Sequence, residues 1–151
     1  MNKAFEITQQ NRKILQSYLN NYTLEQLNKI PVGFNNNIFW NVAHTVVVQQ
    51  LLVYKLSGLE PMITKELISK YAKGTKPEKP VSQAEVDEIE NLLFQTIDQT
   101  KTDYDNKIFN SYHEFKNDLG FTIKNVDEAI TFNNFHEATH LGIILCIKKF
   151  V

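Results

Sequence analysis

Four long stretches of this sequence place apolar residues every three or four positions, which is the spacing of one face of an α-helix. The stretches cover residues 3–22, 35–57, 82–104 and from 125 almost to the end of the chain. No stretch shows the sustained alternation of apolar and polar residues that predicts a β-strand. The core-facing stripe of the second helix steps by four and three, through Trp40, His44, Val47, Leu51 and Tyr54. The pattern predicts an all-α fold.

The first and last helices are expected to face the core with similar stripes. The stripe predicted for the first helix contains Ile7, Ile14, Leu15 and Tyr18. The stripe predicted for the last helix contains Ala129, Phe132, His136, His140, Ile143 and Ile147. Cys146, near the end of the same helix, is predicted to be a small buried side chain, because free cysteines usually behave as buried hydrophobes.

The boundaries of these helices carry recognisable signals. Ser82 and Glu85 have the spacing of a capping box, which marks the start of the third helix. Residues 58–81 form a long connection whose sequence predicts one short helix at 65–72, and residues 105–124 are polar and predicted to be a loop. Four amphipathic helices joined in this way predict a four-helix bundle with a long connection between its second and third helices. We interpret residues 1–151 as one domain.

Composition excludes several classes of protein. The 151 residues carry 16 basic and 17 acidic side chains, well interspersed, so no basic stripe marks a nucleic-acid surface. No apolar run approaches the roughly 20 residues needed to cross a membrane. The first residues lack the apolar segment of a signal peptide. One cysteine cannot form an internal disulfide, which fits a reducing compartment. We expect a cytoplasmic protein that binds neither nucleic acid nor membrane.

Three of the four histidines are predicted to point into one core. His136 and His140 are four residues apart, so their Cβ atoms lie roughly 5–6 Å apart on one face of the helix. Burying two neutral imidazoles without partners would cost about 1–3 kcal/mol each. A bound metal, or a dedicated hydrogen-bond network, would remove that cost. His44 lies on the inward seam of the second helix, and the three histidines together therefore favour a metal site.

His136, Glu137 and His140 also fit the H-E-x-x-H signature of metalloproteases, but the rest of the sequence argues against a protease. Such enzymes take a third ligand downstream, and no His, Asp or Glu follows His140. In the extended form of the motif a glycine would occupy position 143, where this chain has Ile143. The third ligand must therefore come from upstream, where His44 is the candidate.

Other residues near the predicted site have weaker signals. Glu137 lies at the edge of the inner face, where it could act as a base or orient a histidine, although an exposed helix glutamate is the simpler interpretation. Trp40 lies one turn before the first histidine and could line the pocket or simply pack in the core. Tyr112 and His113 lie in the polar loop, where they could form the mouth of the pocket or be solvated.

Several segments together resemble the DinB/YfiT-like superfamily. They are "LEQLNKIPVGFNNNIFW" and "FWNVAHTVVVQQLL" around the first histidine, and "NVDEAITF" and "FHEATHLGIIL" around the last two. The resemblance implies an up-down-down-up four-helix bundle, often homodimeric, that binds a divalent metal through His44, His136 and His140. One departure is Ile143, where many relatives place a polar residue, often glutamine, after the glycine.

The resemblance also implies a range of functions. Relatives include thiol S-transferases that use bacillithiol and an isomerase that uses mycothiol, and others are described as metal-dependent hydrolases. Our leading hypothesis is a metal-dependent transferase of a bacillithiol-type thiol to an electrophilic small molecule, with zinc or nickel as the expected metal. The alternatives are a hydrolase that uses metal-bound hydroxide and a stress-response protein that binds metal without catalysis.

Overall fold

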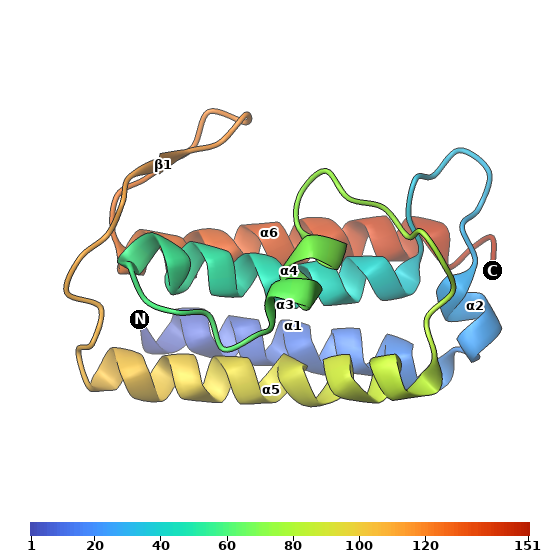
Figure 1. The fold of residues 1–151 in the computed structure, drawn as a ribbon, viewed down its shortest axis with the longest axis horizontal. Coiled ribbons are helices and arrows are strands. Elements are labelled where there is room, and N and C mark those ends of the chain that lie inside the picture. The colour runs from blue at the N-terminus through green and yellow to red at the C-terminus, as the bar shows by residue number, and fades with distance from the viewer.

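Four long helices run side by side in the computed structural model, which describes residues 1–151 (Figure 1). They are α1 (Asn2–Asn21), α3 (Ile38–Val53), α5 (Gln83–Asp105) and α6 (Val126–Ile147). In the view of Figure 1, α3 and α6 lie above α1 and α5, and α1 and α6 run opposite to α3 and α5. The chain is therefore an up-down-down-up four-helix bundle, as predicted.

Shorter elements fill the connections between the long helices. They are α2 (Leu24–Asn28), the 3-10 turn η1 (Lys55–Ser57), α4 (Lys65–Tyr71), and the strands β1 (Phe115–Lys116) and β2 (Thr122–Ile123). The short helix predicted in the long connection is α4, which packs against α3. The predicted loop between α5 and α6 contains an antiparallel hairpin of β1 and β2. Strands of two residues are too short to show the alternation by which sequence predicts them.

The central position of α3 makes it buried on almost every side. It packs against α6, α5, α4, α2 and α1. In the predicted stripe, Leu51 is half-buried and the other four residues are buried. Because α3 is enclosed, polar side chains on it need partners inside the protein, and this is where the first histidine lies. None of the helices is both long and apolar enough to cross a membrane.

The outer helices face the core differently from the prediction. On α1, Ile7 and Ile14 are exposed, while Arg12 is completely buried. The buried residues of α6 follow the steps Ile130, Asn133, Glu137, His140, Ile144 and Ile147, so the centre of this face is rotated from the predicted stripe. Cys146 is exposed, and the prediction that it is buried was wrong. These differences arise because α1 and α6 face each other through partnered polar side chains as well as apolar ones.

Candidate metal centre

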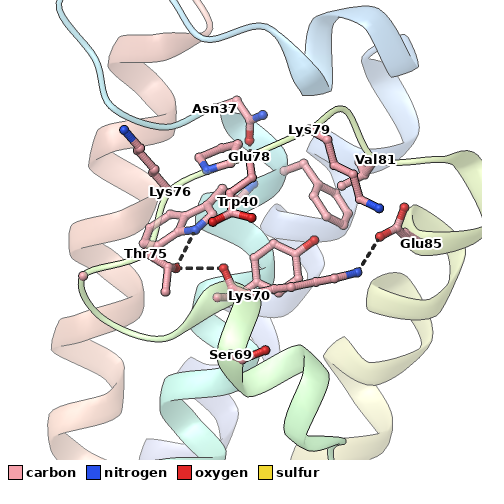
Figure 2. A pocket seen from close by; sticks show the side chains of 14 residues that line it. Asn37, Trp40, Ser69, Lys70, Thr75, Lys76, Glu78, Lys79, Val81 and Glu85 are labelled. Carbon is pink, nitrogen blue, oxygen red and sulfur yellow. Dashed lines mark hydrogen bonds and ion pairs between the residues drawn. The ribbon is translucent and has the colours of Figure 1, made fainter.

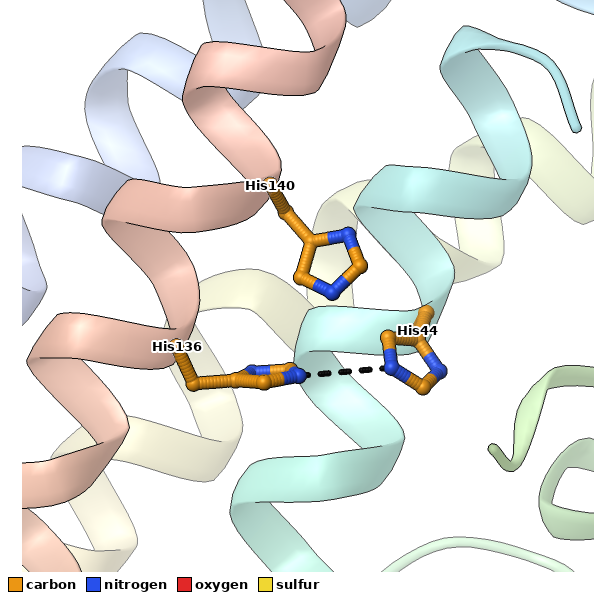
Figure 3. A group of neighbouring side chains, drawn as sticks. All are labelled: His44, His136 and His140. Carbon is orange, nitrogen blue, oxygen red and sulfur yellow. Dashed lines mark hydrogen bonds between the residues drawn. The ribbon is translucent and has the colours of Figure 1, made fainter. Parts of the chain in front are cut away.

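The three histidines predicted to be metal ligands come together between α3 and α6 (Figure 3). His44 lies in the first half of α3, and His136 and His140 lie one turn apart on the facing side of α6. The coordinating atoms of the three side chains all lie within 4.8 Å of one another. His44 and His140 are buried, and His136 is partly buried.

The separation of the ring nitrogens fits a shared ion. His136 Nε2 lies 3.3 Å from His44 Nε2. Two nitrogens bound to a tetrahedral zinc at 2.0–2.1 Å would be separated by roughly 3.3–3.4 Å. The two facing nitrogens are therefore separated by the distance expected between two ligands of one tetrahedral ion.

The position of the His44 ring is determined by two contacts. Its Nδ1 lies 2.6 Å from the backbone carbonyl oxygen of Tyr71, which can only accept a hydrogen bond. Nδ1 must therefore carry the proton, and the lone pair of Nε2 points toward the other histidines. The indole ring of Trp40 stacks on the imidazole with ring centroids 4.5 Å apart and an interplanar angle of 14°.

An asparagine of α3 orients the His140 ring in the same way. His140 Nδ1 lies 2.8 Å from Asn41 Oδ1. The Asn41 amide group donates to Asn36 Oδ1 at 2.9 Å and to the Asn37 carbonyl at 2.7 Å, which identifies its oxygen as the atom that faces the histidine. His140 therefore also carries its proton on Nδ1 and presents the Nε2 lone pair to the site.

The surroundings keep all three imidazoles neutral. Burial, followed by the neighbouring histidines and Arg12, lowers the pKa of His136 to about 2. Burial and His44 lower the pKa of His140 to about 3. Burial also lowers the pKa of His44, partly offset by the hydrogen bond to Tyr71. Neutral imidazoles are the form in which histidine binds metal.

These lowered pKa values predict that the metal-free protein loses stability below neutral pH. An unfolded histidine has a pKa near 6.5, so below that pH the unfolded chain binds protons that folded His136 and His140 do not. As the pH falls below this value, each of the two histidines lowers the free energy of unfolding by about 1.4 kcal/mol per pH unit. Urea unfolding with a chelator present, at neutral pH and at about pH 5, measures the loss. His136→Leu should reduce the slope, and an unchanged slope would contradict the assignment.

The donor set fits a transition metal better than magnesium or calcium. The cluster contains three imidazoles and no carboxylate or thiolate. Imidazole suits zinc, nickel, copper and iron, whereas magnesium and calcium prefer oxygen ligands. Three protein ligands also leave a coordination position open, as in catalytic rather than structural zinc sites.

Glu137 lies on the side of α6 that faces α1. Glu137 and Arg12 are both completely buried. The carboxylate oxygen Oε1 accepts from Arg12 Nε at 2.9 Å and lies 2.7 Å from Arg12 Nη2. Asn133 Nδ2 also donates to this oxygen, at 2.9 Å. Glu137 is therefore half of a buried ion pair rather than an exposed glutamate.

Arg12 was not among the residues predicted from the sequence to lie near the site. Arg12 is the only arginine in the chain. Arginine is better suited than lysine to buried ion pairs because its guanidinium group donates several hydrogen bonds in a fixed plane. A single arginine on a predicted core-facing helix was the signal that could have identified it.

The other predicted pocket residues lie in two different places. Trp40 lines a cleft of about 500 Å³ at the N-terminal end of α3 (Figure 2). Tyr71 lines the same cleft, so these two residues separate it from the ring of His44. Tyr112 donates from its hydroxyl to the Leu52 carbonyl. Leu52 follows His44 by eight residues, about 12 Å along the helix axis. The structure therefore does not bring Tyr112 to the histidines.

His113 is exposed and also lies at the far end of α3. Its backbone N–H donates to the Leu56 carbonyl, just beyond the end of that helix. The pocket roles expected for His113 and Tyr112 stay predictions.

Comparisons with known proteins agree with the fold. The sequence matches the DinB superfamily over residues 7–144. The fold is similar to the crystal structure of a conserved protein from Enterococcus faecalis, with a TM-score of 0.67 and 13% sequence identity. That similarity covers 99% of this chain and 95% of the other, and at this identity it shows a shared fold. The comparison with curated proteins found no match. Because the match covers nearly the whole sequence, the chain belongs to the DinB superfamily.

Proposed function

We propose that this protein is a divalent-metal-dependent enzyme that transfers a low-molecular-weight thiol of the bacillithiol type to electrophilic small molecules. The observation that supports it is the convergence of three neutral imidazoles with no acidic ligand among them. Such a set holds a divalent ion without neutralising its charge and leaves a coordination position open. When bound, the ion would supply a positive charge that keeps a coordinated thiol in its reactive thiolate form.

The residues of the chain have separate roles in this proposal. His44, His136 and His140 would hold the ion through their Nε2 atoms. The Tyr71 carbonyl and the Asn41 side chain hold two of these rings in the correct tautomer. Outer partners of this kind orient the ring and make the ligand more basic.

The position of Glu137 favours thiol transfer over hydrolysis. Hydrolysis needs a general base that can reach a water molecule at the ion, and Glu137 was the one candidate the sequence offered. Its carboxylate is paired with Arg12 and also accepts from Asn133. A thiol that the ion would hold as its thiolate would need no such base to attack an electrophile.

The cleft beside Trp40 supports catalysis over simple metal storage. Its lining includes the aromatic residues Phe39 and Trp40. The charged lining residues are Lys70, Lys76, Lys79, Glu78 and Glu85 (Figure 2). Lys70 is paired with Glu85, whereas no ion pair involves Lys76 or Lys79. Three lysines against two glutamates leave a net positive charge beside the aromatic rings, which suits a small anionic molecule. We therefore propose that an anionic part of the thiol or of its substrate binds here, on the other side of Trp40 and Tyr71 from His44.

A conjugation assay tests the proposed activity. Protein loaded with zinc or nickel should couple a bacillithiol-type thiol to an electrophile such as a chlorodinitrobenzene faster than the metal and the thiol do without protein. The rate should return to this background in His140→Ala and stay unchanged in Lys101→Ala, which changes only an ion pair with Asp105 on α5. Ester hydrolysis that needs metal but no thiol would support the hydrolase instead. A loaded protein without turnover would support the non-catalytic role.

The resemblance to dimeric relatives also leads us to propose a homodimer. Light scattering on the purified protein, with and without metal, would measure its mass. A monomer under both conditions would contradict this part of the proposal.

A further inference from the structure

One of the three histidines lacks the outer partner that the other two have. His44 Nδ1 donates to Tyr71 and His140 Nδ1 donates to Asn41. His136 Nδ1 is buried without a hydrogen-bond partner. A histidine that binds metal through Nε2 carries its proton on Nδ1 and almost always donates it to an acceptor. The partner of His136 must therefore be sought in the surrounding residues.

Unpartnered polar atoms are concentrated on α6, the helix of His136, and on α1, which packs against it. Six buried side-chain atoms in the protein lack a partner, and five of them belong to two short runs of α1 and α6. These five are Asn11 Nδ2, Arg12 Nη1, Asn133 Oδ1, His136 Nδ1 and Glu137 Oε2. Buried polar groups in proteins are almost always satisfied, and ordered water satisfies those that no protein atom reaches. The group has both donors and acceptors, which is what a bound water molecule needs.

The orientation of Asn133 is set by the ion pair. The Glu137 carboxylate only accepts hydrogen bonds, so Asn133 must turn its NH₂ group toward it, at 2.9 Å. This leaves Asn133 Oδ1 as a free acceptor. Asn133 precedes His136 by three residues, so the two side chains are neighbours on the surface of α6, with Cβ atoms roughly 5–6 Å apart.

We propose that Asn133 is the positioning residue for His136, and that a buried water molecule between Asn133 Oδ1 and His136 Nδ1 joins them. The Arg12–Glu137 ion pair holds the Asn133 amide in the orientation that presents its oxygen. The chain of contacts runs from Arg12 through Glu137, Asn133 and the water to the ring. This inference rests on the metal site of the proposed function. It means that the buried ion pair helps to orient one of the three metal ligands, His136.

The first test does not depend on metal. A high-resolution crystal structure of the metal-free protein should show an ordered water within hydrogen-bond distance of both Asn133 Oδ1 and His136 Nδ1. The proposal would be overturned if no water lay between Asn133 Oδ1 and His136 Nδ1, or if the water did not reach the histidine. If the wild-type protein bound no metal while this water was present, the proposed function would fail and the described network would stand.

The second test measures metal affinity by competition with a coloured chelator. Asn133→Leu removes the acceptor at similar volume and should weaken metal binding by roughly 10–100-fold, as loss of an outer-shell partner typically does. Asn134→Leu is the matched control, because its neighbouring amide bonds Thr8 and the Ala4 carbonyl across the same helix pair and contacts no histidine. The control should keep the wild-type affinity. Equal affinities in the two variants would overturn the proposal.

A double variant covers the case in which Asn133→Leu does not fold. Arg12→Met with Glu137→Met replaces the ion pair by apolar side chains of similar size, a change that buried pairs often tolerate. The Asn133 amide then loses its anchor and can rotate, so metal affinity should again fall by about 10-fold or more. A folded double variant with wild-type affinity would overturn the role of the ion pair.

Discussion

Replacing His140 with alanine is expected to abolish stoichiometric binding of a divalent transition metal. Its Nε2 is one of three lone pairs that face a common point, and two imidazoles alone make a much weaker site. The loss should therefore exceed the roughly 10–100-fold that removal of an outer-shell partner causes. The wild-type protein should contain close to one equivalent of metal per chain.

Elemental mass spectrometry on protein purified without a histidine tag measures this content. His113→Ala is the matched control, because His113 is the one histidine outside the cluster and is exposed. Trp40, the single tryptophan, gives a second measurement: it stacks on His44, so its fluorescence should change as nickel is titrated in. Wild-type protein that stays metal-free after reconstitution would contradict the metal site.

The helices and the three histidines could be predicted from sequence because their signals are local. Ser82 with Glu85 forms the capping box expected from its spacing, and α4 begins and ends close to the predicted range. His44, His136 and His140 lie on inward faces that follow from helical periodicity alone. The combination of an inward histidine on one helix with two on another is what predicted the cluster.

The remaining features depend on which helices face each other, and no local pattern contains that information. Arg12 and Glu137 are separated by 125 residues, and although Arg12 is the only arginine, no local pattern identifies Glu137 as its partner. The apolar stripe predicted for α1 placed Ile7 and Ile14 toward the core because apolar residues are usually buried. In the structure, α6 presents Asn133 and Glu137 to α1, so α1 turns its polar residues inward to meet them.

The buried ion pair predicts a large difference between single and double replacements. Glu137→Ala would leave the Arg12 guanidinium completely buried without its counter-charge, and its other bond, to the Thr45 carbonyl, is long at 3.3 Å. Breaking one side of such a pair typically costs about 3–5 kcal/mol. Replacing both residues with methionine removes both charges, and changes of that kind are often neutral or stabilising by about 1–4 kcal/mol.

Urea unfolding of the metal-free variants measures this difference. Lys101→Ala is the control, because it breaks the ion pair with Asp105 on the surface of α5, where such pairs contribute about 0–1 kcal/mol. If Glu137→Ala were no more destabilising than Lys101→Ala, water would have to reach the Arg12 guanidinium and solvate its charge. If both replacements together were as costly as the single one, the pair would stabilise the fold itself. The expected result, a costly single and a tolerated double replacement, would mean that stability does not require the pair; its role in orienting Asn133 is then measured by the metal affinity of the double variant.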